Sequence, residues 1–340
     1  MSHDSGDKKV VSFSRSVFLP VTNLCRNRCS YCGFRRNPED GAWFLSEEEV
    51  LELARQGKEH GCSEALFTLG ERPEIYDKAK ERLDEWGHSS TVDYLEDLCK
   101  RVLDLGLFPH VNPGILERRE LDKLKEWSAS MGLMLESAAE LPVHDESPGK
   151  DPNLRLKTIA EAGKLKIPFT TGLLVGIGES RKERTEALLK IRDLDRRYGH
   201  IQEVIIQPFA PKSGTPMSNA PPPPVSKILS TVKEARRLMP EMNIQVPPNL
   251  TDNDNVINFL RAGANDLGGI SSLTPDFINP ENLWPSVREL RGILEPNGFK
   301  LRERLPIYPE FVSDDRFMSV EIRSKIRKMT DEDGYRRVPS

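Results

Sequence analysis

Several features that mark other classes of protein are missing from this sequence. No apolar run approaches the roughly 20 residues of a membrane-spanning helix, and the first segment, MSHDSGDKKV, lacks the apolar core of a signal peptide. Lysine and arginine form no long block, and the net charge is −4, so a nucleic-acid-binding face is not indicated. We therefore expect a cytoplasmic protein that binds neither a membrane nor nucleic acid.

Cysteine is scarce as well, with five among 340 residues. Three of the five lie within eight residues, CRNRCSYC, as Cys25, Cys29 and Cys32. In a reducing compartment, clustered cysteines indicate a metal site or catalysis rather than a disulfide framework.

Short β-rich runs alternate with longer segments of helical periodicity. The expected strands are 17–22, 64–70, 107–112, 133–137, 169–176, 203–209, 243–247 and 266–271. The expected helices are 46–61, 91–106, 117–128, 153–166, 181–198, 226–239, 254–262 and 285–295. Several strands are almost continuously apolar, which is typical of buried parallel strands. About eight βα units predict an α/β fold, a TIM-type (βα)8 barrel or a near-complete form of it.

The chain divides into three expected regions. Residues 1–14 are predicted to be a flexible N-terminal tail, residues 15–299 the barrel, and residues 300–340 a C-terminal extension packed on the barrel. The Pro-rich stretch 210–224 is a long loop after the sixth strand. Loops of that length in a compact domain are usually functional or disordered.

The three clustered cysteines follow the first expected strand, at the end of a barrel where active sites gather. A structural zinc site needs four ligands, and no fourth Cys or His lies nearby. An iron–sulfur cluster held by three cysteines instead leaves one iron open to a small ligand. The C-x3-C-x2-C spacing, with Tyr31 before the last cysteine, resembles the radical S-adenosylmethionine (SAM) superfamily, whose [4Fe-4S] cluster binds SAM at that iron.

The resemblance implies further SAM-binding residues. In this superfamily the second strand ends in a Gly-Gly-Glu-like segment that meets the SAM amine. The corresponding segment here is TLGE, with Thr68, Gly70 and Glu71, although Leu69 replaces one glycine. A plain strand end would also explain TLGE.

Two later strands offer other candidates. Glu136 and Ser137 end the fourth expected strand, where a carboxylate suits ribose hydroxyls or a helix N-cap. The stretch TGLLVGIGES, which contains Gly176, is similar to the glycine-rich SAM segment of the biotin-synthase-like branch. Arg155 and Arg184 flank it, and either is a candidate partner for the SAM carboxylate or an ordinary surface arginine.

A more specific resemblance is spread over most of the chain. It is carried by NLCRNRCSYCGFRR (23–36), LFTLGERPE (66–74), FPHVNPG (108–114), IQEVIIQPFAPKSGTPM (201–217), LTPDFINPENLWP (273–285) and LRERLPIYPEF (301–311). These segments resemble the CofG family, subunit 1 of the 7,8-didemethyl-8-hydroxy-5-deazariboflavin (FO) synthases of coenzyme F420 biosynthesis.

The resemblance implies a radical SAM lyase and cyclase of the ammonia-lyase type. Its substrate would be the uracil–hydroxybenzyl adduct 5-amino-5-(4-hydroxybenzyl)-6-(D-ribitylimino)-5,6-dihydrouracil. A 5′-deoxyadenosyl radical made from SAM would take a hydrogen from the adduct, giving FO, ammonia, methionine and 5′-deoxyadenosine. A CofH-like radical SAM subunit, bound stably or transiently, would supply the adduct. A flavodoxin or ferredoxin would supply electrons.

Polar residues at the expected strand ends are candidate substrate contacts. His110 and Asn112 end the third strand and are the candidate catalytic residues, although His110 also fits an ordinary loop histidine. Asn279 and Trp284 are expected to close over the lumen, or Trp284 to be part of the core. Two alternatives stay open, a CofH-like hydroxybenzyl transferase and, from another class, a zinc-stapled binding module.

Overall fold

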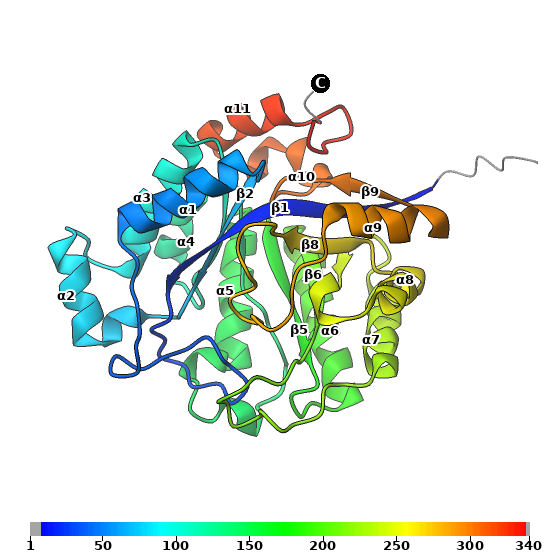
Figure 1. Cartoon of the computed structure of the whole chain (residues 1–340), viewed down its shortest axis with the longest axis horizontal. Helices are drawn as coiled ribbons and strands as arrows, with labels where there is room; N and C mark the ends of the chain where they lie inside the picture. Colours follow the sequence, from blue (N-terminus) through cyan, green and yellow to red (C-terminus); the bar gives the residue numbers. More distant parts are fainter. Residues whose placement is uncertain (1–7, 338–340) are drawn as a thin grey trace, which may run out of the picture.

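Each strand of the sheet pairs in parallel with its neighbour, and β1 pairs with both β2 and β8, which closes a barrel (Figure 1). This computed structural model describes residues 8–337. The strands are β1 Lys9–Thr22, β2 Glu64–Leu69, β3 Phe108–Asn112, β4 Ser130–Gly132, β5 Phe169–Val175, β6 Ile201–Pro208, β7 Ile244–Gln245, β8 Asp266–Ile270 and β9 Phe299–Glu303. The predicted TIM-type barrel is confirmed.

Helices surround the barrel on its outer side (Figure 1). They are α1 Glu47–Glu59, α2 Asp77–Glu85, α3 Thr91–Asp104, α4 Arg118–Lys125, α5 Pro152–Lys164, α6 Arg181–Tyr198, α7 Val225–Leu238, α8 Asn253–Ala262, α9 Val287–Leu294, α10 Pro309–Val312 and α11 Val320–Met329. Capping boxes at Ser46 and Ser180 fix the starts of α1 and α6 because each serine and the glutamate three residues later satisfy free backbone N–H groups. No helix within residues 8–337 is long and apolar enough to cross a membrane.

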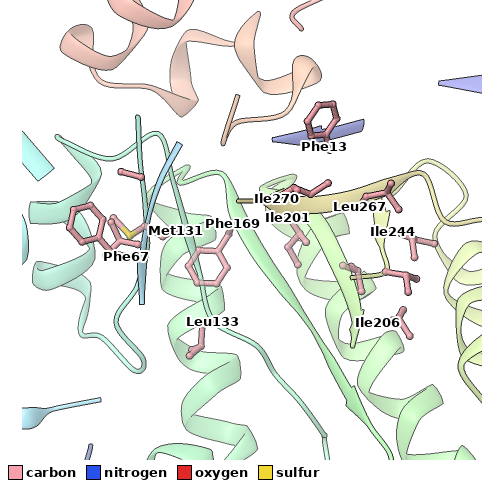
Figure 2. Close-up of a cluster of buried hydrophobic side chains, with 14 of the residues drawn as sticks. Phe13, Phe67, Met131, Leu133, Phe169, Ile201, Ile206, Ile244, Leu267 and Ile270 are labelled. Atoms are coloured by element: carbon pink, nitrogen blue, oxygen red, sulfur yellow. The ribbon is translucent and has the colours of Figure 1, made fainter. Parts of the chain in front are cut away.

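Alternate residues of each strand face opposite sides of the barrel wall. On β6, Val204 and Ile206 belong to the apolar core under the helices, whereas Glu203, Ile205 and Gln207 line the lumen. Figure 2 shows the outer set, with Phe67, Met131, Phe169 and Ile206 among the labelled side chains. The apolar outer side of the barrel wall therefore stabilises the fold by packing against the helices. The side that faces the lumen can hold polar groups.

The expected boundaries of two strands, β1 and β4, are wrong. β1 begins at Lys9 rather than residue 17, so residues 9–14 of the expected tail are strand, while residues 1–7 lie outside the described residues. β4 is 130–132 rather than 133–137. After Gly132 the chain no longer pairs as a regular strand, although the Leu133 and Glu136 N–H groups still donate to carbonyls of β5; Glu136 itself has a φ of 64°, in the left-handed region.

The segment after β8 and α9 closes the amino-terminal end of the barrel. β9 pairs with the start of β1, so the expected boundary at residue 300 falls inside a strand. The chain then forms what we call the plug, residues 304–308. Its Pro306 carbonyl accepts hydrogen bonds from Ser130 (2.6 Å) and Gln202 (3.1 Å). The helical segments after the plug pack in a second apolar cluster against Phe108 of β3 and Ala129, the residue before β4.

Arg304 anchors the plug from inside the barrel. Its guanidinium group donates to both carboxylate oxygens of Asp266 on β8, at 2.7 and 3.0 Å, and both residues are buried. Removing one partner of a buried ion pair leaves the other charge uncompensated.

We expect Arg304→Met to lower the free energy of unfolding by about 3–5 kcal/mol because Asp266 would then be buried without its cation. Urea unfolding followed by circular dichroism measures this change. Arg237→Met is the matched control, since its pair with Glu234 lies on the exposed face of α7 and should contribute less than about 1 kcal/mol. Equal losses in the two variants would contradict the anchoring role of Arg304.

Candidate active site

A cavity of about 390 Å³ runs through the barrel lumen. At the carboxyl ends of the strands it is bordered by the loop after β1 (residues 23–36, the cysteine loop) and by the loops after β6 and β8. At the other end it reaches Arg304 and Pro306 of the plug. The long Pro-rich loop borders it through Lys212 and contacts the cysteine loop, where the Met217 N–H donates to the Ser30 carbonyl at 3.2 Å.

Cys25, Cys29 and Cys32 all line this cavity. The Cys25 sulfur accepts hydrogen bonds from the backbone N–H groups of Asn27 (3.4 Å) and Glu71 (3.2 Å). The Cys29 sulfur accepts one from the Ser147 hydroxyl at 3.4 Å. Burial raises the pKa of Cys25 and of Cys29. These thiols are therefore readily deprotonated only when a bound metal cation stabilises the thiolates.

The end of β2 is fitted closely to the cysteine loop. A Cβ atom on Gly70 would lie 1.9 Å from the Leu24 carbonyl oxygen, so only glycine permits this approach. The Glu71 carboxylate is buried and accepts hydrogen bonds from Arg26 (2.7 Å) and from the Ile115 N–H (3.2 Å). Thr68, Gly70 and Glu71 line the cavity as predicted for a ligand site, but the Glu71 carboxylate is already occupied by protein partners.

Glu136 is the centre of a buried polar cluster beside Cys29. Its carboxylate accepts from the Tyr31 hydroxyl, from Lys150, and from His144 at 3.2 Å. Burial alone would raise the pKa of Glu136, but Lys150, Arg155 and His144 outweigh it and hold that pKa well below its usual range. Tyr31 and Glu136 line the cavity, and the pKa of Tyr31 is raised well above its usual value by burial and by the Glu136 charge.

The predicted arginines differ in their placement. Arg155 lines the cavity and donates to the Gly149 carbonyl at 2.9 Å and to that of Met134. Arg184 is buried away from it, in an ion pair with Glu179 at 2.9 Å. Ser137 and Gly176 also lie outside the cavity lining.

His110 and Asn112 line the lumen from β3. His110 Nδ1 lies 2.7 Å from the Ser130 hydroxyl, whose single hydrogen is given to the Pro306 carbonyl. Nδ1 must therefore carry the imidazole proton, which leaves Nε2 as an acceptor. Burial lowers the pKa of His110, so the ring is neutral near pH 7.

The cavity is also lined by Asn279 and Trp284, as expected from the sequence, and by Arg35 and Glu203, which sequence reasoning missed. Within residues 8–337, four buried polar atoms of lining residues have no hydrogen-bond partner: Arg35 Nε, Glu203 Oε1, Asn279 Oδ1 and Trp284 Nε1. Trp284 stacks on Phe18 with ring centroids 5.4 Å apart. Burying an unpaired polar atom is costly, so such atoms are candidate ligand contacts.

The cysteines suit a cluster of several metal ions better than a single ion. Among residues 8–337, no three His, Cys, Asp or Glu side chains converge on a point where one ion would be held. The three cysteines instead border one shared space, and two of their sulfurs accept hydrogen bonds of the kind that stabilise bound thiolates. The donor set therefore fits an iron–sulfur cluster.

Comparison with known proteins agrees with this geometry. The model of the radical SAM superfamily matches residues 19–191. The chain is 50% identical over 336 residues to 7,8-didemethyl-8-hydroxy-5-deazariboflavin synthase of Methanopyrus kandleri, covering 96% of this chain and 100% of that protein. It is 52% identical to the protein of the same name from Methanosarcina barkeri over 331 residues, covering 97% and 100%.

Solved structures show the same fold. The [FeFe]-hydrogenase maturase HydG from Carboxydothermus hydrogenoformans superimposes with a TM-score of 0.69 at 23% identity, covering 86% of this chain and 68% of that one. Methylornithine synthase (PylB) does so with a TM-score of 0.62 at 22% identity, covering 86% and 83%.

The close approach at Gly70 generates a prediction for metal content. We expect Gly70→Ala to displace the cysteine loop and to reduce the iron and sulfide retained per chain after anaerobic reconstitution at least severalfold. Gly292→Ala is the control, because a Cβ on Gly292 of α9 meets nothing within 4 Å and should leave the iron content unchanged. Full iron content in Gly70→Ala would contradict the proposed fit.

Proposed function

Because this chain belongs to the radical SAM superfamily and, within it, to the FO synthases, we propose that it is the subunit that closes the deazaflavin ring. Its substrate is then the uracil–hydroxybenzyl adduct named above, and its products are FO, ammonia, methionine and 5′-deoxyadenosine. The identity of about half of all positions over almost the whole chain carries this proposal. Membership of the superfamily implies SAM and an iron–sulfur cluster.

Cys25, Cys29 and Cys32 would hold a [4Fe-4S] cluster and leave its fourth iron for SAM. When bound, the cluster supplies the electron that cleaves SAM to methionine and the 5′-deoxyadenosyl radical, which takes a hydrogen from the adduct. We propose that the backbone at Thr68 and Gly70 meets the SAM amine; the support is that both residues line the cavity and Gly70 packs closely against Cys25.

Tyr31, Glu136 and Arg155 form the second part of the SAM site in this proposal. Glu136 stays ionised because Lys150, Arg155 and His144 surround it, so it can accept hydrogen bonds from hydroxyl groups. Arg155 is held rigidly by two backbone carbonyls, which leaves its remaining N–H groups for a carboxylate.

The remaining lining residues suit the adduct. His110 Nε2 is an acceptor held in one orientation by Ser130, and Asn112 lies on the same strand, so both side chains can form hydrogen bonds with the adduct. Asn279 Oδ1 and Trp284 Nε1 offer an unpaired acceptor and an unpaired donor. This pair complements the N–H and C=O groups of a uracil ring edge.

The Pro-rich loop contributes by excluding water. Its Lys212 is buried and its Met217 binds the cysteine loop, so the loop covers one side of the site. A reactive carbon radical needs such a closed space to avoid side reactions. In this proposal a CofH-like subunit supplies the adduct and a flavodoxin or ferredoxin supplies the electron.

The decisive measurement is anaerobic turnover of the synthetic adduct with SAM and a reductant. We expect FO fluorescence to appear together with 5′-deoxyadenosine, and both to disappear in Cys29→Ala. A CofH-like transferase would instead consume tyrosine and 5-amino-6-(D-ribitylamino)uracil and leave the adduct unchanged. A colourless, zinc-loaded protein without either activity would point to the binding module.

The unpaired polar atoms of Asn279 and Trp284 generate a separate prediction. Trp284→Phe keeps an aromatic ring against Phe18 but removes the indole N–H, so we expect kcat/KM for the adduct to fall about three- to tenfold, mainly through KM. The rate of SAM cleavage at saturating adduct should change little. Trp86→Phe, in an aromatic cluster with Phe44 and Tyr94 outside the cavity, is the control. Unchanged KM in Trp284→Phe would remove Trp284 from the substrate site.

A further inference from the structure

The amino-terminal end of the lumen is lined by polar side chains from five strands, which we call the barrel floor. Its members are Glu64 of β2, His110 of β3, Thr170 of β5, Glu203 of β6 and Gln245 of β7. All line the same cavity as the cysteines. Parallel strands start at one end of a barrel, so these residues lie deep below the cysteine loop. Glu203 precedes Gln207 by four residues on β6, which is roughly 13 Å along a strand.

Glu203 has an unused hydrogen-bonding atom in this buried place. The residue is 4% exposed. Its Oε2 accepts from the Thr170 hydroxyl at 3.3 Å and lies 3.7 Å from Arg304. Its Oε1 has no partner among residues 8–337. The Tyr308 hydroxyl faces the same carboxyl group but makes no well-formed hydrogen bond, and it too is unpaired within that range.

The other two carboxylates at this level make closer contacts with the protein. Glu64 accepts hydrogen bonds from Ser16 at 2.8 Å and from Ser14, both at its Oε2. Asp266 takes both strong hydrogen bonds of Arg304 and one from Ser12. The single guanidinium group is therefore committed to Asp266, and Glu203 is left 3.7 Å from it without a hydrogen bond between the two.

Burial raises the pKa of Glu203 to about 8, with Asp266 adding to the shift and Arg304 opposing it. Near pH 7 the group is then largely protonated. A protonated carboxyl group both donates and accepts hydrogen bonds, as an alcohol does. The floor is thus suited to an uncharged ligand that carries hydroxyl groups rather than to an anion or a cation.

The upper wall of the cavity has a different character. Leu69, Leu174, Ile205 and Ile278 line it nearer the cysteine loop, together with Phe34. Aromatic rings bury well against such apolar side chains. On the floor, a phenol ring would offer one polar atom and leave the other polar groups unpaired, which is costly. A linear polyol has hydroxyl groups along its length and can satisfy several floor residues together.

We propose that the barrel floor binds the ribityl chain of the substrate and that Glu203 is its principal anchor. This inference rests on the proposed function for the identity of the substrate. It orients the adduct with its polyol at the plug and its two rings toward the cysteines, where the bond-forming atoms must be. Glu203 then acts as a positioning and specificity residue rather than as an acid or base.

Equilibrium binding to the unreduced, cluster-loaded enzyme tests this orientation without turnover. The probes are FO and the same deazaflavin with a methyl group in place of the ribityl chain, followed by their fluorescence. We expect the wild-type enzyme to bind FO about tenfold more tightly than the methyl analogue. Glu203→Leu should remove most of this preference by weakening FO binding alone, and Glu203→Gln, which keeps a donor and an acceptor, should retain most of it.

Glu310→Gln is the control, because Glu310 lies two residues after the plug, does not line the cavity, and keeps an oxygen for its hydrogen bond from Asn243 when it becomes an amide; the preference for FO should survive. Equal weakening of both ligands in Glu203→Leu, or no wild-type preference, overturns the assignment of the floor. The wild-type comparison needs no variant, so poor folding of Glu203→Leu would not hide that result. If the wild-type enzyme forms FO from the adduct but shows no ribityl preference, only this inference fails. If no FO forms, the proposed function fails first.

Discussion

The buried carboxylate of Glu71 holds the candidate active site together. This carboxylate accepts hydrogen bonds from the Arg26 side chain of the cysteine loop and from the Ile115 N–H in the segment after β3. The backbone N–H of Glu71 donates to the Cys25 sulfur. A Cβ on Gly114 or Gly149 would come within 2.4 or 1.9 Å of this side chain. Three loops thus meet at one ion pair, and loss of the partly exposed Arg26 would leave the buried Glu71 carboxylate without its cation. The placement of the cysteines depends on this joint.

The two ends of the lumen differ in their charged groups. The carboxyl end carries the cysteines and the Glu136 cluster, where charges are densely paired. The amino end is closed by the plug, whose Arg304 pairs with Asp266, while burial raises the pKa of Glu203 to about 8 and leaves that group largely protonated near pH 7. The plug follows β9, which pairs with the first residues of β1, so the segment that closes this end is fixed to the start of the barrel.

The sequence predicted the barrel because its two periodicities are local. Helical periodicity predicted α6 at residues 181–198, as observed, and the β-rich apolar runs found most strands within a few residues. The errors arose where a tertiary contact decides. Lys9–Ser14 has too short an apolar pattern to stand out and is exposed at its first two residues, and it becomes a strand by pairing with β9 and β8. β4 was displaced because the apolar run continues past Gly132, where regular strand pairing ends and only isolated hydrogen bonds to β5 remain.

The same distinction separates the site residues that sequence could identify from those it could not. The cysteines were recognisable because their spacing within one loop is itself the chemical requirement. Arg184 looked equivalent to Arg155, yet Glu179, five residues before it, consumes its charge, and no spacing rule tells an internally paired cation from one that faces a ligand. No sequence pattern marked Glu203. Its proposed role depends on the ion pair between Arg304 and Asp266, which leaves Glu203 without a cation of its own. A function that rests on an unpaired atom becomes visible only when every other partner has been placed.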